Sequence, residues 1–182
     1  MPFPHRQLLV PILPVKRLIF ARHAKSSWSY PHLSDIERPL NKRGKKAAPI
    51  MGRALREQEM IPEAIFASPS VRTRKTSALL AKQLEFPLEE IEIVDSFYGA
   101  DPEMVAQFAK GLDDHLSTVM LVGHNPTWTS MSYRLTGEHL GNLPTSGILV
   151  IDFKIEQWAD LNDKGKRKAL LIPRNFNCGG GQ

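Results

Sequence analysis

The chain has a single cysteine and few long apolar runs, and both scarcities limit what it can be. Cys178 alone can form no internal disulfide and no thiolate metal cluster, which fits a protein of the reducing cytoplasm. The apolar runs are interrupted well before the roughly 18 to 20 residues that cross a bilayer. The first 16 residues contain four prolines and no clean apolar segment with a cleavage site. We therefore expect neither a signal peptide nor a membrane partner.

Several ligand-binding signatures are also missing. The six histidines make no HExxH or related ligand spacing, so we expect no metal. No glycine-rich segment has the Walker spacing, which excludes ATP binding in that mode. We expect no cofactor of any kind.

Length and composition are those of one globular domain. With 182 residues, 42% of them hydrophobic and 24% charged, the chain can bury a substantial core unaided. We expect a short N-terminal extension over residues 1–15, one domain over 16–175 and a flexible tail over 176–182, where three glycines follow one another.

The charge of the chain favours anionic partners. The formal net charge is +5 and the pI about 9.4. No RRM, KH or helix-turn-helix signature with interleaved aromatics is present, so we expect no nucleic-acid partner. The run of Lys42, Arg43, Lys45 and Lys46 is interpreted as a solvent-facing first turn of a helix, which could still attract an acidic partner.

Apolar periodicity predicts repeated units of strand, loop and helix. The expected strands cover residues 15–21, 64–67, 91–94, 118–122, 147–154 and 169–172, the last two forming a hairpin. The expected helices run from Asn41 as N-cap to about residue 59, over 72–84, over 102–110, and from the turn at 123–126 to residue 135. This order predicts an α/β three-layer sandwich, with a mostly parallel central sheet and helices on both faces.

Ligands of such sheets bind beyond the carboxyl ends of the strands, where the loops converge. The loops there contain Arg22 with His23, Ser68 with Arg72, and His124 with Asn125. Arginine forks can grip two phosphoryl oxygens at once, and a neutral imidazole can attack phosphorus and carry the phosphoryl group. From the residues alone, either histidine could be that nucleophile.

Four ordered blocks carry a family resemblance. They are RHAKSSW at 22–28, RPL at 38–40 with RG at 43–44, SP at 68–69 with Arg72 and Thr76, and LVGHNP at 121–126. Together they resemble the SixA-type phosphohistidine phosphatases of the histidine phosphatase superfamily, also called phosphoglycerate mutase-like, with Ala24 in place of the usual glycine. The resemblance runs from about residue 16 to residue 153. It marks residues 16–175 as a histidine phosphatase domain.

The resemblance implies a role for each matching residue. By it, His23 is the phospho-acceptor, Arg22 and Arg72 bind the phosphoryl oxygens, and His124 is a further phosphate ligand that also stabilises the transition state. Ser29, Ser68 and Asn125 are implied as substrate-binding neighbours.

The proton donor is the point of departure from the superfamily. Many members carry an acidic residue after the third strand that protonates an alkoxide leaving group, and SixA-type members are thought to lack it. The candidates here are Asp95 and Asp101, with Glu103 nearby, and the match is loose. Because imidazole is a far better leaving group than an alkoxide, lacking a clear acid favours phosphoramidate substrates.

Three functions follow from these observations. The first is a metal-independent phosphatase whose own histidine becomes phosphorylated as an intermediate, and whose substrate is a phosphohistidine of another protein. The second is a phosphatase for a small phosphomonoester, which would need a working acid at Asp95 or Asp101. The third is a phosphate-binding module without catalysis, which the intact His23 and arginines disfavour.

Overall fold

The computed structural model describes residues 14–176 of the chain. The expected N-terminal extension falls almost wholly outside the described residues, as does the expected tail with Cys178.

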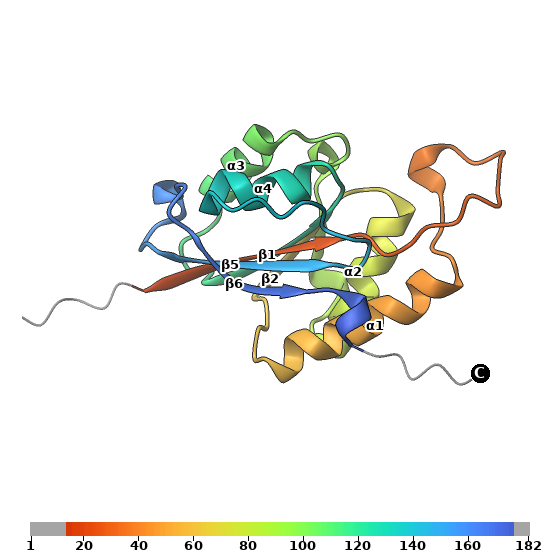
Figure 1. Cartoon of the computed structure of the whole chain (residues 1–182), viewed down its shortest axis with the longest axis horizontal. Coiled ribbons are helices and arrows are strands. Elements are labelled where there is room, and N and C mark those ends of the chain that lie inside the picture. The colour runs from red at the N-terminus through yellow and green to blue at the C-terminus, as the bar shows by residue number, and fades with distance from the viewer. Residues whose placement is uncertain (1–13, 177–182) are drawn as a thin grey trace, which may run out of the picture.

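One six-stranded sheet forms the centre of the molecule (Figure 1), in the spatial order β3-β2-β4-β1-β5-β6. Strands β1 to β4 run parallel to one another. Strand β5 runs antiparallel to β1, and β6 runs antiparallel to β5 and so returns to the direction of the first four strands. The strands are β1 (Val15–Arg22), β2 (Ala64–Ala67), β3 (Ile91–Ile93), β4 (Thr118–Gly123), β5 (Ile148–Lys154) and β6 (Lys166–Leu171). The mostly parallel sheet and the terminal hairpin are as predicted.

Two pairs of helices cover the sheet, one pair on each face (Figure 1). One face packs against α1 (Lys42–Glu57) and α2 (Val71–Leu84), and the other against α3 (Pro102–Lys110) and α4 (Thr127–Thr136). The predicted three-layer α/β sandwich is therefore confirmed.

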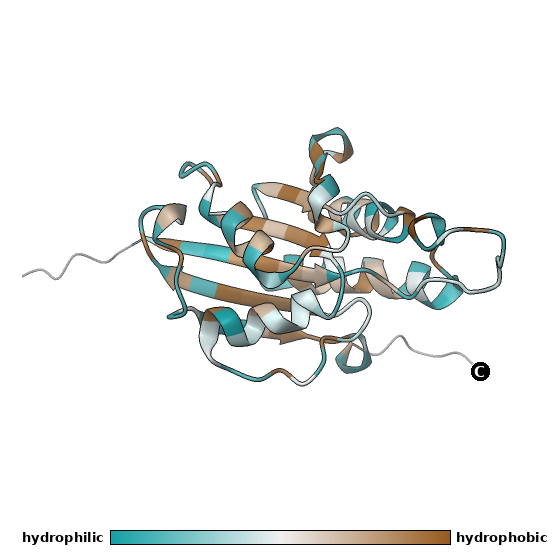
Figure 2. Cartoon of the chain, turned by 90° about the horizontal axis from the view of Figure 1, so that it is seen from above, coloured by the Kyte–Doolittle hydropathy of each residue, from teal (hydrophilic) through white to brown (hydrophobic). Residues whose placement is uncertain are grey.

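Strand β1 shows why both faces must be covered. Leu18 and Phe20 belong to the core beneath α3 and α4, whereas Ile19 and Ala21 belong to the core beneath α1 and α2. All four side chains are buried. A strand buried on both faces is apolar along its length, and Figure 2 shows such apolar residues along the central strands.

Two predicted boundaries shift by a few residues. The first helix ends at Glu57, because Glu59 takes a left-handed conformation with φ of 55°. Strand β6 begins at Lys166, earlier than predicted, because its exposed basic residues pair with β5 through backbone atoms and leave no apolar signal. Pro49 lies inside α1, which continues through it.

Three neighbouring parallel strands position the candidate site. β2, β4 and β1 lie side by side, and their carboxyl ends therefore reach the same edge of the sheet. His23 follows β1, Ser68 follows β2 and His124 follows β4.

Candidate active site

His23 is fixed by backbone contacts immediately after β1. Its backbone N–H donates to the Gly123 carbonyl at 3.0 Å, and its carbonyl accepts from the Ser146 N–H at 3.1 Å. The ring atom Nδ1 lies 2.8 Å from the Ala24 carbonyl oxygen. Because a carbonyl can only accept, the contact requires the proton on Nδ1 and leaves the lone pair on Nε2.

His124 faces His23 across the site. The two ring centroids are 5.3 Å apart, with the planes inclined by 54°. The Nε2 atom of His124 lies 2.7 Å from the Ser68 hydroxyl oxygen. The Ser68 backbone N–H in turn donates to the Val122 carbonyl of β4, which ties the loop after β2 to the neighbouring strand.

Both imidazoles are uncharged at neutral pH. Burial lowers the pKa of His23 to about 4, aided by the charges of Arg72 and Arg22, against the raising effect of the Ala24 contact. Burial also lowers the pKa of His124 to about 3, with His23 and Arg72 as further causes. His23 therefore offers a neutral, nucleophilic nitrogen across the physiological range.

His23 and His124 both line a cavity of about 590 Å³. Arg72 and Asp35 lie on one side, and residues 97–102, before and at the start of α3, line another. Residues 124–128, at the start of α4, complete the wall. The cavity lies beyond the carboxyl ends of β1, β2 and β4, where the sheet rule predicts a ligand.

Arg22 ends β1 with only part of its guanidinium satisfied. One terminal nitrogen donates to the Leu143 carbonyl at 2.7 Å. Its Nε atom is buried and has no hydrogen-bond partner among the described residues. Burial lowers the pKa of this side chain, and an unpaired buried N–H is costly unless an anion satisfies it.

Arg72 is bound by a carboxylate that sequence reasoning missed. One terminal nitrogen of Arg72 donates to the Asp35 carboxylate at 2.8 Å, and the other donates to the Asp35 carbonyl. The same carboxylate accepts from Arg38 at 2.8 Å and from the Tyr98 hydroxyl at 2.9 Å. Asp35 thus occupies donors of the buried arginine that was expected to hold phosphate.

Asp35 is an ionised carboxylate and not a proton donor. Partial burial raises its pKa, but hydrogen bonds from Arg72, Tyr98 and Arg38 outweigh that effect and lower the pKa to about 2. At neutral pH the group can only accept hydrogen bonds.

Arg38 supports the loop between β1 and α1. Its guanidinium donates to the Ser26 hydroxyl at 2.8 Å and to the Ser27 carbonyl at 3.1 Å. It also stacks 3.2 Å from the ring centroid of Trp28, whose side chain is 76% exposed. The exposed Trp28 ring therefore packs against a buried arginine that also donates a hydrogen bond to Asp35 at the cavity.

Comparison with known proteins agrees with this geometry. Residues 18–101 match the model of the histidine phosphatase superfamily (branch 1). An uncharacterized protein of Mycobacterium leprae is 31% identical over 166 residues, which cover 84% of this chain and 99% of that protein. The chain belongs to the histidine phosphatase superfamily.

Solved structures of this superfamily share the fold. The putative phosphohistidine phosphatase SixA from Agrobacterium tumefaciens is 28% identical, with a TM-score of 0.75, and the match covers 87% of this chain and 99% of that one. A protein histidine phosphatase SixA complexed with tungstate also has a TM-score of 0.75, at 21% identity, covering 88% and 99% of the two chains. The SixA-type resemblance is therefore confirmed, and the superfamily supports phosphatase activity.

Of the three residues expected to bind substrate beside the phosphate, two lie in the cavity or at its edge. Asn125 lines the cavity and is held by donation to the Leu143 carbonyl at 3.0 Å. Ser68 contacts His124 directly. Ser29 does not line the cavity, because the loop around it turns outward and leaves it exposed.

The two expected general acids are separated by the fold. Asp101 lines the cavity, but its carboxylate caps α3 by accepting from the Met104 N–H at 2.8 Å. Asp95 begins a short turn after β3 and is not among the residues that line the cavity. Neither residue is placed like a free acid facing His23.

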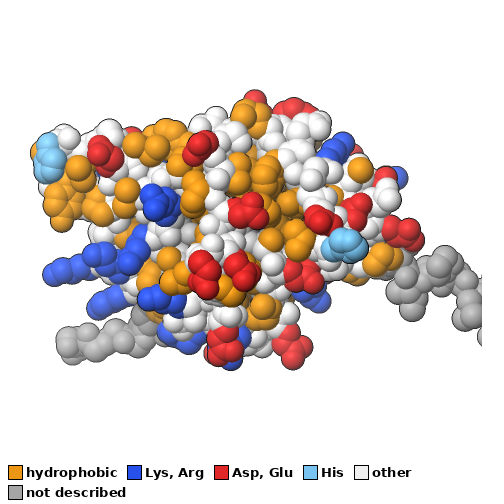
Figure 3. Space-filling model, turned by 180° about the vertical axis from the view of Figure 1, so that it is seen from behind, with side chains coloured by type: hydrophobic (Ala, Val, Ile, Leu, Met, Phe, Trp, Pro, Cys, Tyr) orange, Lys and Arg blue, Asp and Glu red, His pale blue; other side chains and the backbone are white. Residues whose placement is uncertain are grey.

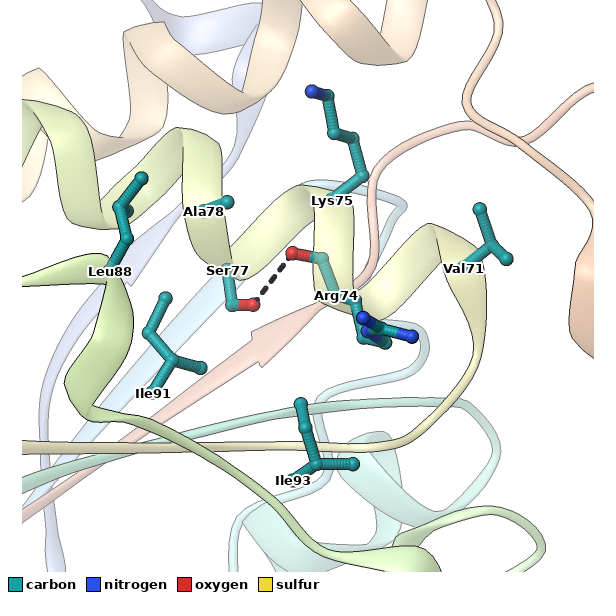
Figure 4. Close-up of a pocket in the computed structure, with 8 residues that line it drawn as sticks. All are labelled: Val71, Arg74, Lys75, Ser77, Ala78, Leu88, Ile91 and Ile93. Atoms are coloured by element: carbon teal, nitrogen blue, oxygen red, sulfur yellow. Dashed lines mark hydrogen bonds between the residues drawn. The ribbon is translucent and has the colours of Figure 1, made fainter.

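A second hollow lies along the outer side of α2 (Figure 4). Its walls are mainly apolar, from Val71, Leu88, Ile91 and Ile93. The Ser77 hydroxyl there donates to the Arg74 carbonyl at 2.9 Å, and no histidine or carboxyl group lines the hollow. It therefore lacks the groups that phosphoryl transfer needs.

The described residues form neither a metal site nor a membrane-spanning helix. Between residues 14 and 176, no group of three or more histidine, cysteine, aspartate or glutamate side chains is arranged to hold a metal ion. No helix in that range is sufficiently long and apolar to cross a bilayer.

Proposed function

We propose that this protein is a metal-independent phosphohistidine phosphatase in which His23 accepts the phosphoryl group. One observation carries the proposal: a neutral imidazole with its lone pair on Nε2 lies in a cavity with Arg72 and His124, and no carboxyl group there is poised to give a proton. This combination suits attack on a phosphoryl group with a good leaving group.

The reaction has two steps. In the first, Nε2 of His23 attacks phosphorus and forms a P–N bond, while the P–N bond to the substrate imidazole breaks. The substrate ring, protonated by solvent on its other nitrogen, leaves as neutral imidazole and keeps the electron pair of the broken bond. In the second step, water attacks the phosphorus of phosphorylated His23, which releases inorganic phosphate and restores the free imidazole.

The arginines and His124 serve the charge of the phosphoryl group in this proposal. The unpartnered buried Nε of Arg22 is a donor for a phosphoryl oxygen. Arg72 offers its guanidinium once the oxyanion displaces the Asp35 carboxylate. Ser68 orients His124 through the 2.7 Å contact, and a related SixA was solved with tungstate, an oxyanion.

Leaving-group chemistry selects the substrate class. Asp35 is ionised, and the Asp101 carboxylate is committed to capping α3. A sugar or serine alkoxide needs a proton, and general acid catalysis is worth roughly 100- to 10,000-fold in rate. Imidazole, with an ordinary pKa of about 6.5 for its conjugate acid, departs without that help. The proposed substrate is therefore a phosphorylated histidine, most simply on a protein of the cytoplasm.

A small phosphomonoester is the second candidate, and one observation favours it. Asp101 lies at the cavity and could protonate an alkoxide if it left its capping position. That would cost about 1 kcal/mol of helix capping.

The deciding experiment compares phosphate release from phosphohistidine and from a phosphomonoester in the presence of EDTA. We expect phosphohistidine to be cleaved, His23→Ala to abolish the cleavage, and Asp101→Asn to leave it intact. Faster cleavage of the ester, lost in Asp101→Asn, would establish the second candidate. Loss of activity in EDTA would contradict the metal-independent mechanism.

A further inference from the structure

The first turns of α1 and α2 have an unusual charge pattern. Neither turn contains an acidic residue. Acidic side chains are favoured at helix N-termini and basic ones are disfavoured, because the helix dipole is positive there. Apart from the buried Arg72, the cations present are exposed: Lys42, Arg43, Lys45 and Lys46 on α1, and Arg74 and Lys75 on α2, which together we name the basic rim. Helix stability therefore does not account for them.

The two turns lie at one end of the molecule. Helices α1 and α2 lie side by side and run in the same direction, because Gly52 lies against Leu80 whereas the later Arg56 pairs with the later Glu85. Both helices begin at the catalytic edge of the sheet: α2 supplies Arg72 to the cavity, and α1 starts beside Lys25, whose carbonyl accepts from the Asn41 N–H at 3.0 Å. The basic rim therefore borders the candidate active site.

The positive charge of the rim is not neutralised by salt bridges with other described residues. Among residues 14–176, none of its six members takes part in a salt bridge, although Arg56 near the other end of α1 pairs with Glu85 at 2.7 Å. All six side chains are exposed. Figure 3 shows Lys and Arg side chains gathered at the end of the molecule where the β1–α1 loop projects, with most Asp and Glu side chains over the middle and the other end.

We propose that the basic rim docks an acidic surface of the phosphorylated protein substrate and thereby presents its phosphohistidine to His23. The proposal rests on the proposed function and adds a partner chemistry to it. Complementary charge between two proteins raises their rate of encounter by roughly 10- to 1,000-fold. Salt weakens this attraction, because the Debye length shortens to about 10 Å at 0.1 M.

The test uses two synthetic phosphohistidine peptides of equal length, one flanked by glutamates and the other by lysines. At low salt we expect the glutamate peptide to have roughly tenfold or higher kcat/KM, and 0.5 M salt to remove most of the difference. Equal values for the two peptides in the wild-type protein would overturn the proposal.

Two charge-reversed variants locate the effect. Lys42→Glu with Lys45→Glu places acidic residues where the α1 dipole favours them, so the fold is retained or strengthened. The matched control is Lys164→Glu with Lys166→Glu, at the sheet end far from the cavity, since Lys166 pairs with Asp152 and the catalytic end of β5 is Ile148. We expect only the first variant to lose the peptide preference. If both variants lose the preference for the glutamate peptide equally, the preference comes from the net charge of the protein, and the proposal that the rim is a docking site is wrong.

Binding separates this proposal from the phosphatase proposal. Trp28 is the exposed tryptophan, whereas Trp128 and Trp158 are fully buried, so fluorescence reports on the surface beside the rim. If no peptide is hydrolysed, the proposed function fails, but salt-sensitive binding of the unphosphorylated glutamate peptide still supports docking. If a single-stranded oligouridylate binds more tightly than that peptide and displaces it, the rim is a nucleic-acid site and the proposal is wrong.

Discussion

Lowering the pH from 7 to 5 should leave His23 uncharged. Burial holds its pKa at about 4 instead of the ordinary 6.5. Since one pKa unit is worth 1.36 kcal/mol, the folded protein disfavours the charged ring by roughly 3 kcal/mol. At pH 5.5 an ordinary histidine would be only about one-tenth neutral, whereas His23 should remain almost wholly neutral.

The assay is an NMR titration of the His23 ring C–H, with single-turnover phosphorylation of His23 by phosphoramidate at pH 5.5 and pH 7. We expect a titration midpoint near 4 and phosphorylation that is not reduced by protonation of the ring at pH 5.5. A midpoint near 6.5 would refute the assignment of a buried neutral nucleophile.

The same pKa shift predicts a loss of stability toward acid. Between pH 6.5 and pH 4 this histidine is protonated in the unfolded chain but not in the folded chain. The unfolded state therefore binds more protons, and the free energy of unfolding decreases as the pH is lowered. The loss from His23 between pH 7 and pH 5 should be about 2 kcal/mol. In His23→Asn, urea unfolding should show a smaller difference between these two pH values by about that amount. An unchanged difference would contradict the burial argument.

Three further predictions concern the arginine, the carboxylate that binds it, and the glycine before His124. Arg72→Ala should remove roughly 2–4 kcal/mol of transition-state stabilisation, which steady-state kinetics would show as a lower kcat/KM for phosphohistidine. Asp35→Asn should tighten inorganic phosphate binding by calorimetry, because the carboxylate that competes for Arg72 loses its charge; an unchanged Kd would count against that competition. Gly123→Ala should cost about 1–3 kcal/mol in urea unfolding, since the new Cβ would lie 2.3 Å from the Trp128 ring, whereas Gly111→Ala meets nothing nearer than 3.6 Å and should be tolerated there.

The fold could be predicted because the local signals agree with one another. Strands such as β4 are continuous apolar runs that end at a turn, and helices such as α3 begin with a capping aspartate and a proline. Histidines that directly follow such strands must meet at the sheet edge. The positions of His23 and His124 therefore followed from sequence order and the rule for parallel sheets.

The role of Asp35 could not be predicted in the same way. It lies in an irregular loop, 37 positions before the Arg72 that it binds, and no periodicity relates the two. Tyr98, which also donates to it, is 63 positions away. Such contacts depend on how the loop folds over the site, which composition and spacing do not encode.

Polar residues within strands were also ambiguous from sequence. Lys16 and Arg17 interrupt the apolar pattern of β1, yet the strand includes both. Lys16 is buried and donates to the Leu116 carbonyl at 2.9 Å, and Arg17 pairs with Asp152 of the neighbouring β5 at 2.6 Å. Their partners come from elements more than 95 positions away, so only the tertiary structure explains why the strand tolerates them.

The loop between β1 and α1 links leaving-group chemistry to substrate choice. It supplies Asp35, whose ionised carboxylate cannot donate a proton at the cavity, and Arg38, which carries the exposed Trp28. It also leads into the basic first turn of α1. A site without a poised acid favours an imidazole leaving group, and an imidazole phosphate on a protein arrives with a surface around it. Because the rim is cationic and lies beside the same cavity, the proposed chemistry and the proposed docking surface favour the same kind of substrate, a phosphohistidine set in an acidic protein surface.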